Sequence, residues 1–282
     1  MNAHWLVPDW PAPPGVSAVF TTRQGGLSPV PFDSMNLGDH VGDAPAEVAA
    51  NRALLSKAVG ARTIFLQQVH GAAVLGLHPQ TPDGGLADAC LTAERHLACT
   101  IMVADCLPVL LATRCGTWVG AAHAGWRGLS GRPALAGDSG EPACYSGGVL
   151  EAIFQSFAAV VKAPIAFSAT DLIAWLGPCI GPDAFEVGED VKAAFEATQP
   201  ETKSCFVAAG PGKFMADLPA LARYRLQTLG VGPAQIYGND SSAAWCTARN
   251  PSRFFSHRRD AAVSGGNGFG TTGRMAACVW KT

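Results

Sequence analysis

Three side chains that can bind a metal ion or act as nucleophiles follow or interrupt apolar segments of the chain. They are His70, Cys106 and His123. Two imidazoles and one thiolate form a natural ligand set for Zn²⁺ and leave a fourth position for water or substrate. The same residues also allow a dyad in which Cys106 is the nucleophile and His123 is the base. A structural role is the third possibility, since a buried cysteine packs as a small apolar group.

Several other metal and nucleotide sites lack their characteristic residues. A copper oxidase needs a dense set of histidine ligands, and seven histidines without a His-X-His pair are a poor supply. The His-X-Glu and Pro-Cys-X-X-Cys pattern of the zinc nucleobase deaminases is absent. The chain also has no Walker A loop and no dinucleotide-binding glycine pattern after a strand. These absences favour a zinc site or a Cys–His dyad.

A group of polar and basic residues on loops could form an anion site near these three side chains. The candidates are Asn36, His40, Arg52, Arg127, Arg258 and Arg259. Guanidinium groups suit phosphate because two N–H donors match two phosphate oxygens. The alternative is that each arginine is exposed and makes only weak surface ion pairs, an alternative that is stronger for Arg259 than for Arg127.

Arg127 is the favoured phosphate ligand because it follows His123 by four residues. Gly125 and Gly128 flank the Trp-Arg pair, so a tight turn can aim the guanidinium back over a metal. Asp105 is expected to be structural. Within a strand it alternates with Cys106 and would point to the opposite face.

The elements that must position these residues are read from the apolar pattern. Nearly continuous apolar runs predict buried strands at residues 100–112 and 117–122, with Asp105 and Cys106 in the middle of the first strand. Further strands are predicted at 16–22, 63–69, 72–77, 171–176, 234–237 and 273–280, and helices at 45–60, 149–161, 189–197 and 217–229. Because strands and helices mix without regular βαβ alternation, we expect an α+β fold with a mixed sheet and flanking helices, in a single domain over residues 1–282.

Composition restricts the partners and the compartment. Charged residues make up 15% of the 282 residues, against a usual value of about 25%, and the net charge of −2 gives no case for nucleic acid or a membrane surface as a partner. We find neither a signal peptide nor an apolar run of about 18 residues. Nine scattered cysteines suit reduced thiols. We expect a cytoplasmic protein that is a monomer or a weak homo-oligomer.

Two long segments without periodic apolar residues are predicted to be loops. The first, residues 28–43, contains Asn36 and His40 and is expected to be functional because of its length. The second, residues 129–148, is rich in Gly, Pro and Ser and is expected to be a mobile loop near the cleft, with Cys144 as an exposed thiol.

The motifs together resemble one bacterial family, the YfiH-like proteins, variously named polyphenol oxidase (laccase domain), purine nucleoside phosphorylase and peptidoglycan editing factor. The resemblance extends from about residue 16 to residue 280. It rests on TTRQGGLSPVPFDSMNLGDHVGD, the Asn51-Arg52 pair, QQVHG, VADCLPVLLA, GAAHAGWRG, LGPCIGPDAFEVG and FFSHRRD–TGRMAACVW. It implies a YfiH-like, CNF1-like α+β fold with zinc bound by His70, Cys106 and His123.

The resemblance also implies an activity. We expect a zinc-dependent purine nucleoside phosphorylase that acts on adenosine, inosine, guanosine and methylthioadenosine, with adenosine deaminase activity. Cys106, His123 and Arg127 would be catalytic, and Asn36, His40, Arg52, Arg127 and Arg258 would bind substrate or phosphate. The alternatives are an amidase that removes L-serine from a UDP-linked muramyl precursor, a copper polyphenol oxidase, and a zinc-stabilised protein without catalysis. The chain departs from the family pattern by insertions at residues 129–148 and between Arg259 and Gly273, both beside motif residues.

Overall fold

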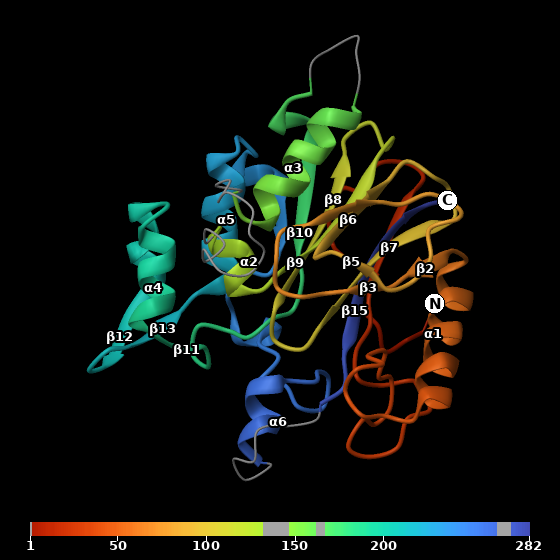
Figure 1. Cartoon of the computed structure of the whole chain (residues 1–282), viewed down its shortest axis with the longest axis horizontal. Coiled ribbons are helices and arrows are strands. Elements are labelled where there is room, and N and C mark those ends of the chain that lie inside the picture. The colour runs from red at the N-terminus through yellow and green to blue at the C-terminus, as the bar shows by residue number, and fades with distance from the viewer. Residues whose placement is uncertain (1, 132–146, 162–166, 264–271) are drawn as a thin grey trace, which may run out of the picture.

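Two β-sheets pack face to face, and helices cover the outer face of each sheet (Figure 1). The computed structural model describes residues 2–131, 147–161, 167–263 and 272–282. The resulting order of layers is helix, sheet, sheet, helices. No helix within these ranges combines the length and the apolar content needed to cross a membrane.

The smaller main sheet has four strands. In spatial order they are β1 (Val16–Phe20), β15 (Met275–Lys281), β7 (Leu97–Val103) and β2 (Arg62–Ile64). β15 runs antiparallel to both of its neighbours, whereas β2 is parallel to β7. The first and last strands of the chain therefore lie side by side in this sheet.

The larger main sheet has six strands and is also mixed. In spatial order they are β14 (Ile236–Gly238), β10 (Leu172–Leu176), β8 (Leu107–Thr113), β9 (Val119–Ala124), β6 (Ala89–Thr92) and β4 (Val74–Gly76). The two outer pairs are parallel and the central pairs are antiparallel. This arrangement places β8 and β9 at the centre of the molecule.

Side chains that alternate along each strand belong to different hydrophobic clusters. In β8, Leu110 and Ala112 contribute to the cluster between the two sheets, whereas Val109 and Leu111 contribute to the cluster under the helices. Both faces of the strand are thus buried, which explains why its sequence is apolar at nearly every position. Trp280 of β15 packs on the outer side of the smaller main sheet.

The helices lie on opposite sides of this double sheet (Figure 1). α1 (Pro45–Val59) packs on the four-stranded sheet and ends at Gly60, which adopts the left-handed conformation. α3 (Val149–Val160) and α5 (Leu218–Thr228) pack on the six-stranded sheet, and Asp217 caps α5 by accepting from the Ala220 N–H.

Smaller elements complete the described chain. These are α2 (Trp126–Ser130), α4 (Glu189–Glu196) and α6 (His257–Val263), the 3₁₀ turns at Ala169–Asp171, Pro200–Cys205, Pro233–Gln235 and Ala243–Trp245, a sheet of β11 (Glu186–Gly188), β13 (Lys213–Ala216) and β12 (Phe206–Gly210), and the pair β3 (Leu66–Gln67) and β5 (Gly85–Leu86). The predicted α+β class with a mixed sheet is confirmed, and the four predicted helices are present with ends shifted by one residue or less at each end.

The prediction of one strand at residues 100–112 is wrong. The chain leaves the four-stranded sheet after Val103 and enters the six-stranded sheet at Leu107, so residues 104–106 form the connection between the sheets. Asp105 has a φ of 89°, which a strand does not allow. The apolar run concealed this break because each strand on either side is buried on both faces.

Three further expectations need correction. Trp126 and Arg127 begin helix α2 rather than forming only a turn, and buried Leu129 belongs to that helix rather than to a surface loop. The segment after Phe255 forms α6, where no helix was predicted. Residues 132–146, including Cys144, and residues 264–271 in the second insertion lie outside the described residues, so the expected mobile loop is not tested.

Candidate metal centre

The three candidate ligands meet at one end of the double sheet. His70 lies in the connection between β3 and β4 with a φ of 63°, and Cys106 ends the connection between the two main sheets. His123 belongs to β9 and pairs with Pro108 of β8, close to the start of that strand. His70 lies 36 residues before Cys106 in the sequence, and His123 lies 17 residues after it. The strand order of the six-stranded sheet brings the three together.

The donor atoms of these three residues converge. One ligand atom from each of His70, Cys106 and His123 lies within 4.8 Å of the other two. The Cys106 Sγ is 3.7 Å from the His70 Nε2, and the two imidazole rings are 4.7 Å apart at an interplanar angle of 68°. His70 is exposed whereas His123 is buried, so the site opens to solvent on the His70 side.

Asp88 orients both histidines, and sequence analysis missed it. Its buried carboxylate accepts hydrogen bonds from the backbone N–H groups of Val69, His70 and Gly71. The same carboxylate lies 2.8 Å from the His123 Nδ1, so that nitrogen carries the proton and Nε2 is left for a metal. The one available signal was an acidic residue placed directly before a buried strand.

The charges of the cluster are mutually stabilised. Burial raises the pKa of Cys106, but His123 and then His70 outweigh burial and lower that pKa to about 6. Burial lowers the pKa of His123, but the Cys106 thiolate and Asp88 outweigh it and raise that pKa to about 9. The cysteine is therefore a thiolate at neutral pH, which is the form that binds metal. A metal ion would displace the proton from the free imidazole nitrogen of His123.

Gly125 leaves room for this cluster. A Cβ at that position would lie 2.9 Å from the His70 Cδ2 and 3.1 Å from the Cys106 Sγ. Gly125 also precedes α2 and is its N-terminal capping position. The absence of a side chain at Gly125 therefore lets the backbone approach the ligating side chains.

A cavity of about 380 Å³ opens above the three ligands. Its wall includes the predicted residues His40, Arg127 and Arg258 together with three residues that sequence analysis did not select: Gln68, His257 and Arg274. Asp105 also lines the cavity, and apolar side chains complete the wall, namely Met102, Val103, Ala104, Ile180, Phe185, Leu218 and Trp126. The three candidate metal ligands thus form the floor of the cavity, and its walls include basic and aromatic side chains.

Two of the predicted arginines rest on aromatic rings of this wall. The Arg127 guanidinium lies 4.5 Å from the centre of the Trp126 ring, and the Arg258 guanidinium lies 5.7 Å from the centre of the Phe185 ring. Arg258 also donates to the backbone carbonyl of Glu186 over 3.1 Å. Within the described chain no carboxylate forms an ion pair with either arginine, so both can meet an anionic ligand.

The structure does not bring three other candidates into this cavity. Asn36 is fully buried and bonds to the loop around it, and Arg259 donates to the backbone carbonyls of Thr247 and Phe254 and to Asp260. Arg52 lines a neighbouring cavity, pairs with Asp39 and lies over the Phe65 ring. These side chains hold local structure in the described chain.

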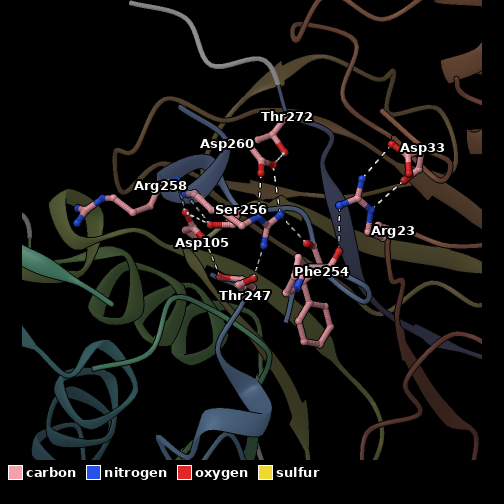
Figure 2. Close-up of polar contacts among 11 residues, drawn as sticks. Arg23, Asp33, Asp105, Thr247, Phe254, Ser256, Arg258, Asp260 and Thr272 are labelled. Atoms are coloured by element: carbon pink, nitrogen blue, oxygen red, sulfur yellow. Dashed lines mark hydrogen bonds and ion pairs between the residues drawn. The ribbon is translucent and has the colours of Figure 1, made fainter. Parts of the chain in front are cut away.

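Asp105 also lines the cavity, and three hydrogen bonds hold its carboxylate (Figure 2). It accepts from the hydroxyl groups of Thr247 over 2.5 Å and Ser256 over 3.1 Å, and from the Arg258 N–H over 2.7 Å. The strand alternation expected to separate Asp105 from Cys106 is absent, because both residues lie in the connection between the sheets and both line the cavity. Asp105 therefore ties the 104–106 connection to the segment that precedes α6.

The donor set fits a single metal ion. Two imidazoles and a preformed thiolate suit zinc, and three protein ligands leave a position open for substrate or water. Across residues 2–131, 147–161, 167–263 and 272–282, no second group of three such donors comes together. The cluster accordingly supports one metal site with an open position.

Comparisons with known proteins agree over nearly the whole chain. The family model described as "Multi-copper polyphenol oxidoreductase laccase" matches residues 17–137 and 143–282. A purine nucleoside phosphorylase of Pseudomonas aeruginosa is 44% identical over 281 residues, which is 99% of each chain. The purine nucleoside phosphorylase YfiH of Escherichia coli is 42% identical over 277 residues, which is 98% of each chain.

Solved structures of similar proteins confirm the fold. A Neisseria meningitidis protein is 41% identical with a TM-score of 0.79 and covers 99% of both chains. YlmD from Geobacillus stearothermophilus is 29% identical with a TM-score of 0.82, covering 100% of this chain and 97% of that one. With a family model that matches both long segments and relatives above 40% identity, the chain belongs to the multi-copper polyphenol oxidoreductase laccase family, which includes the YfiH proteins.

Proposed function

We propose that the protein is a zinc-dependent purine nucleoside phosphorylase that also deaminates adenosine. The observation that carries the proposal is the convergence of His70, Cys106 and His123 beneath a cavity whose wall holds arginines without carboxylate partners in the described chain. The similar proteins of Pseudomonas aeruginosa and Escherichia coli are named purine nucleoside phosphorylases, which supports the same reaction.

The three ligands would hold the ion, and the chain supplies the remaining chemistry. A zinc ion held there would supply Lewis acidity and would make water a better nucleophile near neutral pH. Asp88 keeps the His123 proton on Nδ1 and fixes the turn that carries His70. These contacts hold the ligands in place before substrate arrives.

Phosphorolysis breaks the bond between C1′ of the ribose and the purine and forms a bond from a phosphate oxygen to C1′. Arg127 and Arg258 would hold the phosphate at the sugar, and positioning of this kind is a major source of rate in such reactions. Trp126 and Phe185 supply aromatic wall for the purine. In deamination, water replaces the amino group at C6 of the purine, and no phosphate is needed.

The cavity size favours a nucleoside. About 380 Å³ lies at the low end of the range of roughly 300–1,000 Å³ that is usual for small-molecule pockets. A purine nucleoside fits this scale better than a UDP-linked muramyl precursor does. The single group of metal donors in the described residues also favours one zinc ion over the several copper ions of a polyphenol oxidase.

An amidase is the second candidate, because another cavity adjoins the first. It measures about 560 Å³ and shares His40 and Gln68 with the metal cavity. Arg52, Asp39 and Phe65 contribute to its wall. Together the two cavities offer space for a longer substrate such as a nucleotide-linked muramyl compound.

We also place the protein in the cytoplasm and describe it as one domain that is monomeric or weakly self-associating. All eight cysteines of the described chain are free, which suits a reducing compartment.

Metal analysis and product analysis test the proposal together. The purified protein should contain about one zinc per chain, and Cys106→Ala should lose it, whereas Cys115→Ala, at an exposed cysteine beyond the far end of β8, should keep it. The loaded protein should release hypoxanthine from inosine only when phosphate is present. Full zinc occupancy in Cys106→Ala would refute the ligand assignment. Absence of phosphate-dependent base release, with serine release from UDP-muramyl-L-serine, would establish the amidase instead.

A further inference from the structure

Arg274 is a third arginine of the metal cavity; it stands in the TGRMAACVW motif but was not among the predicted site residues. It directly precedes β15, whose first residue Met275 pairs with Val103 at the end of β7. This position places Arg274 at the same end of the sheets as Cys106, and its side chain lines the same cavity. A residue 168 positions from Cys106 in sequence thus joins the site through the pairing of β7 with β15.

The Arg274 guanidinium has no carboxylate partner among the residues that the structure describes. Its Nη1 donates to the backbone carbonyls of Thr272 over 2.9 Å and Gly273 over 3.4 Å. Five other arginines of the described chain do pair with carboxylates, namely Arg23, Arg52, Arg225, Arg249 and Arg259. The nearby Asp105 carboxylate already accepts three other hydrogen bonds.

Burial of this cation is therefore only partly compensated. Burial lowers the pKa of Arg274, and the neighbouring Cys106 and Asp105 oppose that effect. The same guanidinium helps burial to lower the pKa of His40 on the cavity wall. These two groups offset only part of the cost of burying the charge, and an anionic ligand would offset more of it.

The N-terminal loop holds Arg274 in place. The buried Asn36 accepts from the Arg274 N–H over 2.8 Å, and the Leu37 N–H donates to the Arg274 carbonyl over 3.0 Å. Gly38 packs against the side chain, since a Cβ there would lie 2.7 Å from the Arg274 Cγ. Three consecutive loop residues thus fix both the backbone and the stem of this arginine.

We propose that Arg274 binds the phosphate co-substrate in the metal cavity, and that Asn36 and Gly38 are positioning residues that aim it. This inference rests on the proposed phosphorylase function and adds to it a ligand for phosphate and a role for the N-terminal loop. Two N–H groups, Nε and Nη2, remain free of partners in the described chain and form a pair suited to two phosphate oxygens.

The test measures phosphate binding separately from turnover. Calorimetry of the zinc-loaded protein with inorganic phosphate gives Kd, and initial rates give KM for phosphate and for inosine. Arg274→Met should raise the phosphate Kd and KM by about 10- to 150-fold, with zinc content unchanged. Arg274→Lys keeps the charge but not the paired donors, so a smaller rise of about 3- to 10-fold is expected.

Two further variants test the positioning role of Gly38 and provide a control. Gly38→Ala should raise the KM for phosphate in the same direction, without changing the KM for inosine, because it displaces the Arg274 stem. Arg95→Met is the matched control, since Arg95 is an exposed arginine shortly before β7, at the opposite end of the same sheet. It should leave both constants unchanged.

The outcomes distinguish this inference from the proposed function. A phosphate Kd within twofold of the parent value in both Arg274 variants would overturn the inference, as would an equal loss of inosine binding. The inference would also be overturned if binding of UDP depended on Arg274 and binding of inorganic phosphate did not. That result would assign the arginine to a nucleotide-linked substrate. Phosphate binding that depends on Arg274, without phosphate-dependent base release, would support the inference and refute the phosphorylase.

Discussion

At the residue scale, one carboxylate links two of the candidate metal ligands. Asp88 accepts hydrogen bonds from the backbone N–H groups of residues 69–71 and is also hydrogen-bonded to the His123 ring. The turn that carries His70 and the strand that carries His123 thus share a single buried anchor. Such outer contacts determine the orientation and basicity of metal-binding histidines. Burial raises the pKa of Asp88, but its hydrogen bonds, first that to His123, outweigh burial and lower it.

Replacing Asp88 should weaken metal binding without removing a ligand. In Asp88→Asn, the amide nitrogen cannot accept the hydrogen bonds that the lost oxygen accepted. We expect the zinc affinity to be about 10- to 100-fold weaker, which is the usual effect of losing such a contact. Competition with a chromogenic chelator measures this affinity. Asp83→Asn is the control, because exposed Asp83, among the residues that the structure describes, accepts only from the Phe65 N–H and from no candidate ligand. Equal affinities in the two variants would contradict the role of Asp88.

Asp105 should contribute to stability rather than to turnover. Its carboxylate joins the connection between the main sheets to Thr247, Ser256 and the start of α6 (Figure 2). Asp105→Asn should lower the free energy of unfolding by about 1–3 kcal/mol in urea titrations, because a buried acceptor is lost. The exposed control Asp183→Asn should cost about 0–1 kcal/mol. If turnover collapsed while the unfolding curve stayed unchanged, Asp105 would belong to the catalytic group.

At the scale of elements, the short helix α2 packs very closely on the turn that carries His70. A Cβ at Gly128 would lie 2.6 Å from the Gly71 carbonyl oxygen, and one at Gly125 would meet the His70 ring. The family motif GAAHAGWRG thus places glycines where α2 touches the ligand-bearing turn. The helix in turn carries Arg127 at the edge of the cavity.

Gly128→Ala should therefore disturb the site through α2. Alanine favours a helix over glycine by about 1 kcal/mol, but overpacking against backbone costs about 1–3 kcal/mol. We expect a net loss of thermal stability together with weaker zinc binding, since the displaced turn carries His70. Gly76→Ala on β4 is the matched control, because no atom lies within 4 Å of its added Cβ. Identical behaviour of the two variants would show that α2 and the turn can separate at no cost.

At the scale of the whole molecule, the cavity concentrates positive charge in a protein whose net charge is −2. Arg127, Arg258 and Arg274 reach it from α2, α6 and the start of β15. Each arginine belongs to a different part of the sequence, and the three candidate metal ligands form the floor of the cavity below them. This asymmetry favours an anionic reactant over a neutral one.

Arg127 provides the comparison between the two proposed reactions. Arg127→Ala should reduce phosphorolysis of inosine by about 10- to 150-fold, since one charge-assisted hydrogen bond contributes about 1.5–3 kcal/mol. Deamination of adenosine needs no phosphate and should fall much less. Arg95→Ala, at an exposed arginine away from the cavity, should change neither rate. Equal losses in both reactions would mean that Arg127 positions the nucleoside or the turn instead of phosphate.

The sequence by itself determined the α+β class, the four main helices and the three residues that meet at the candidate metal centre. Apolar periodicity is a local feature, and local features are readable along the chain. His70, Cys106 and His123 stood out because reactive side chains are rare within or beside apolar runs.

Only the tertiary structure decided which basic residues share the cavity and where the central apolar run breaks. β7 and β8 read as one strand because both faces of each are buried, and the sheet to which each belongs depends on pairing with distant partners. Arg52 and Arg127 look alike in sequence, yet the first pairs with Asp39 and the second lines the metal cavity. Arg274 enters the site through the pairing of β15 with β7, a contact between segments about 170 residues apart that no local pattern records.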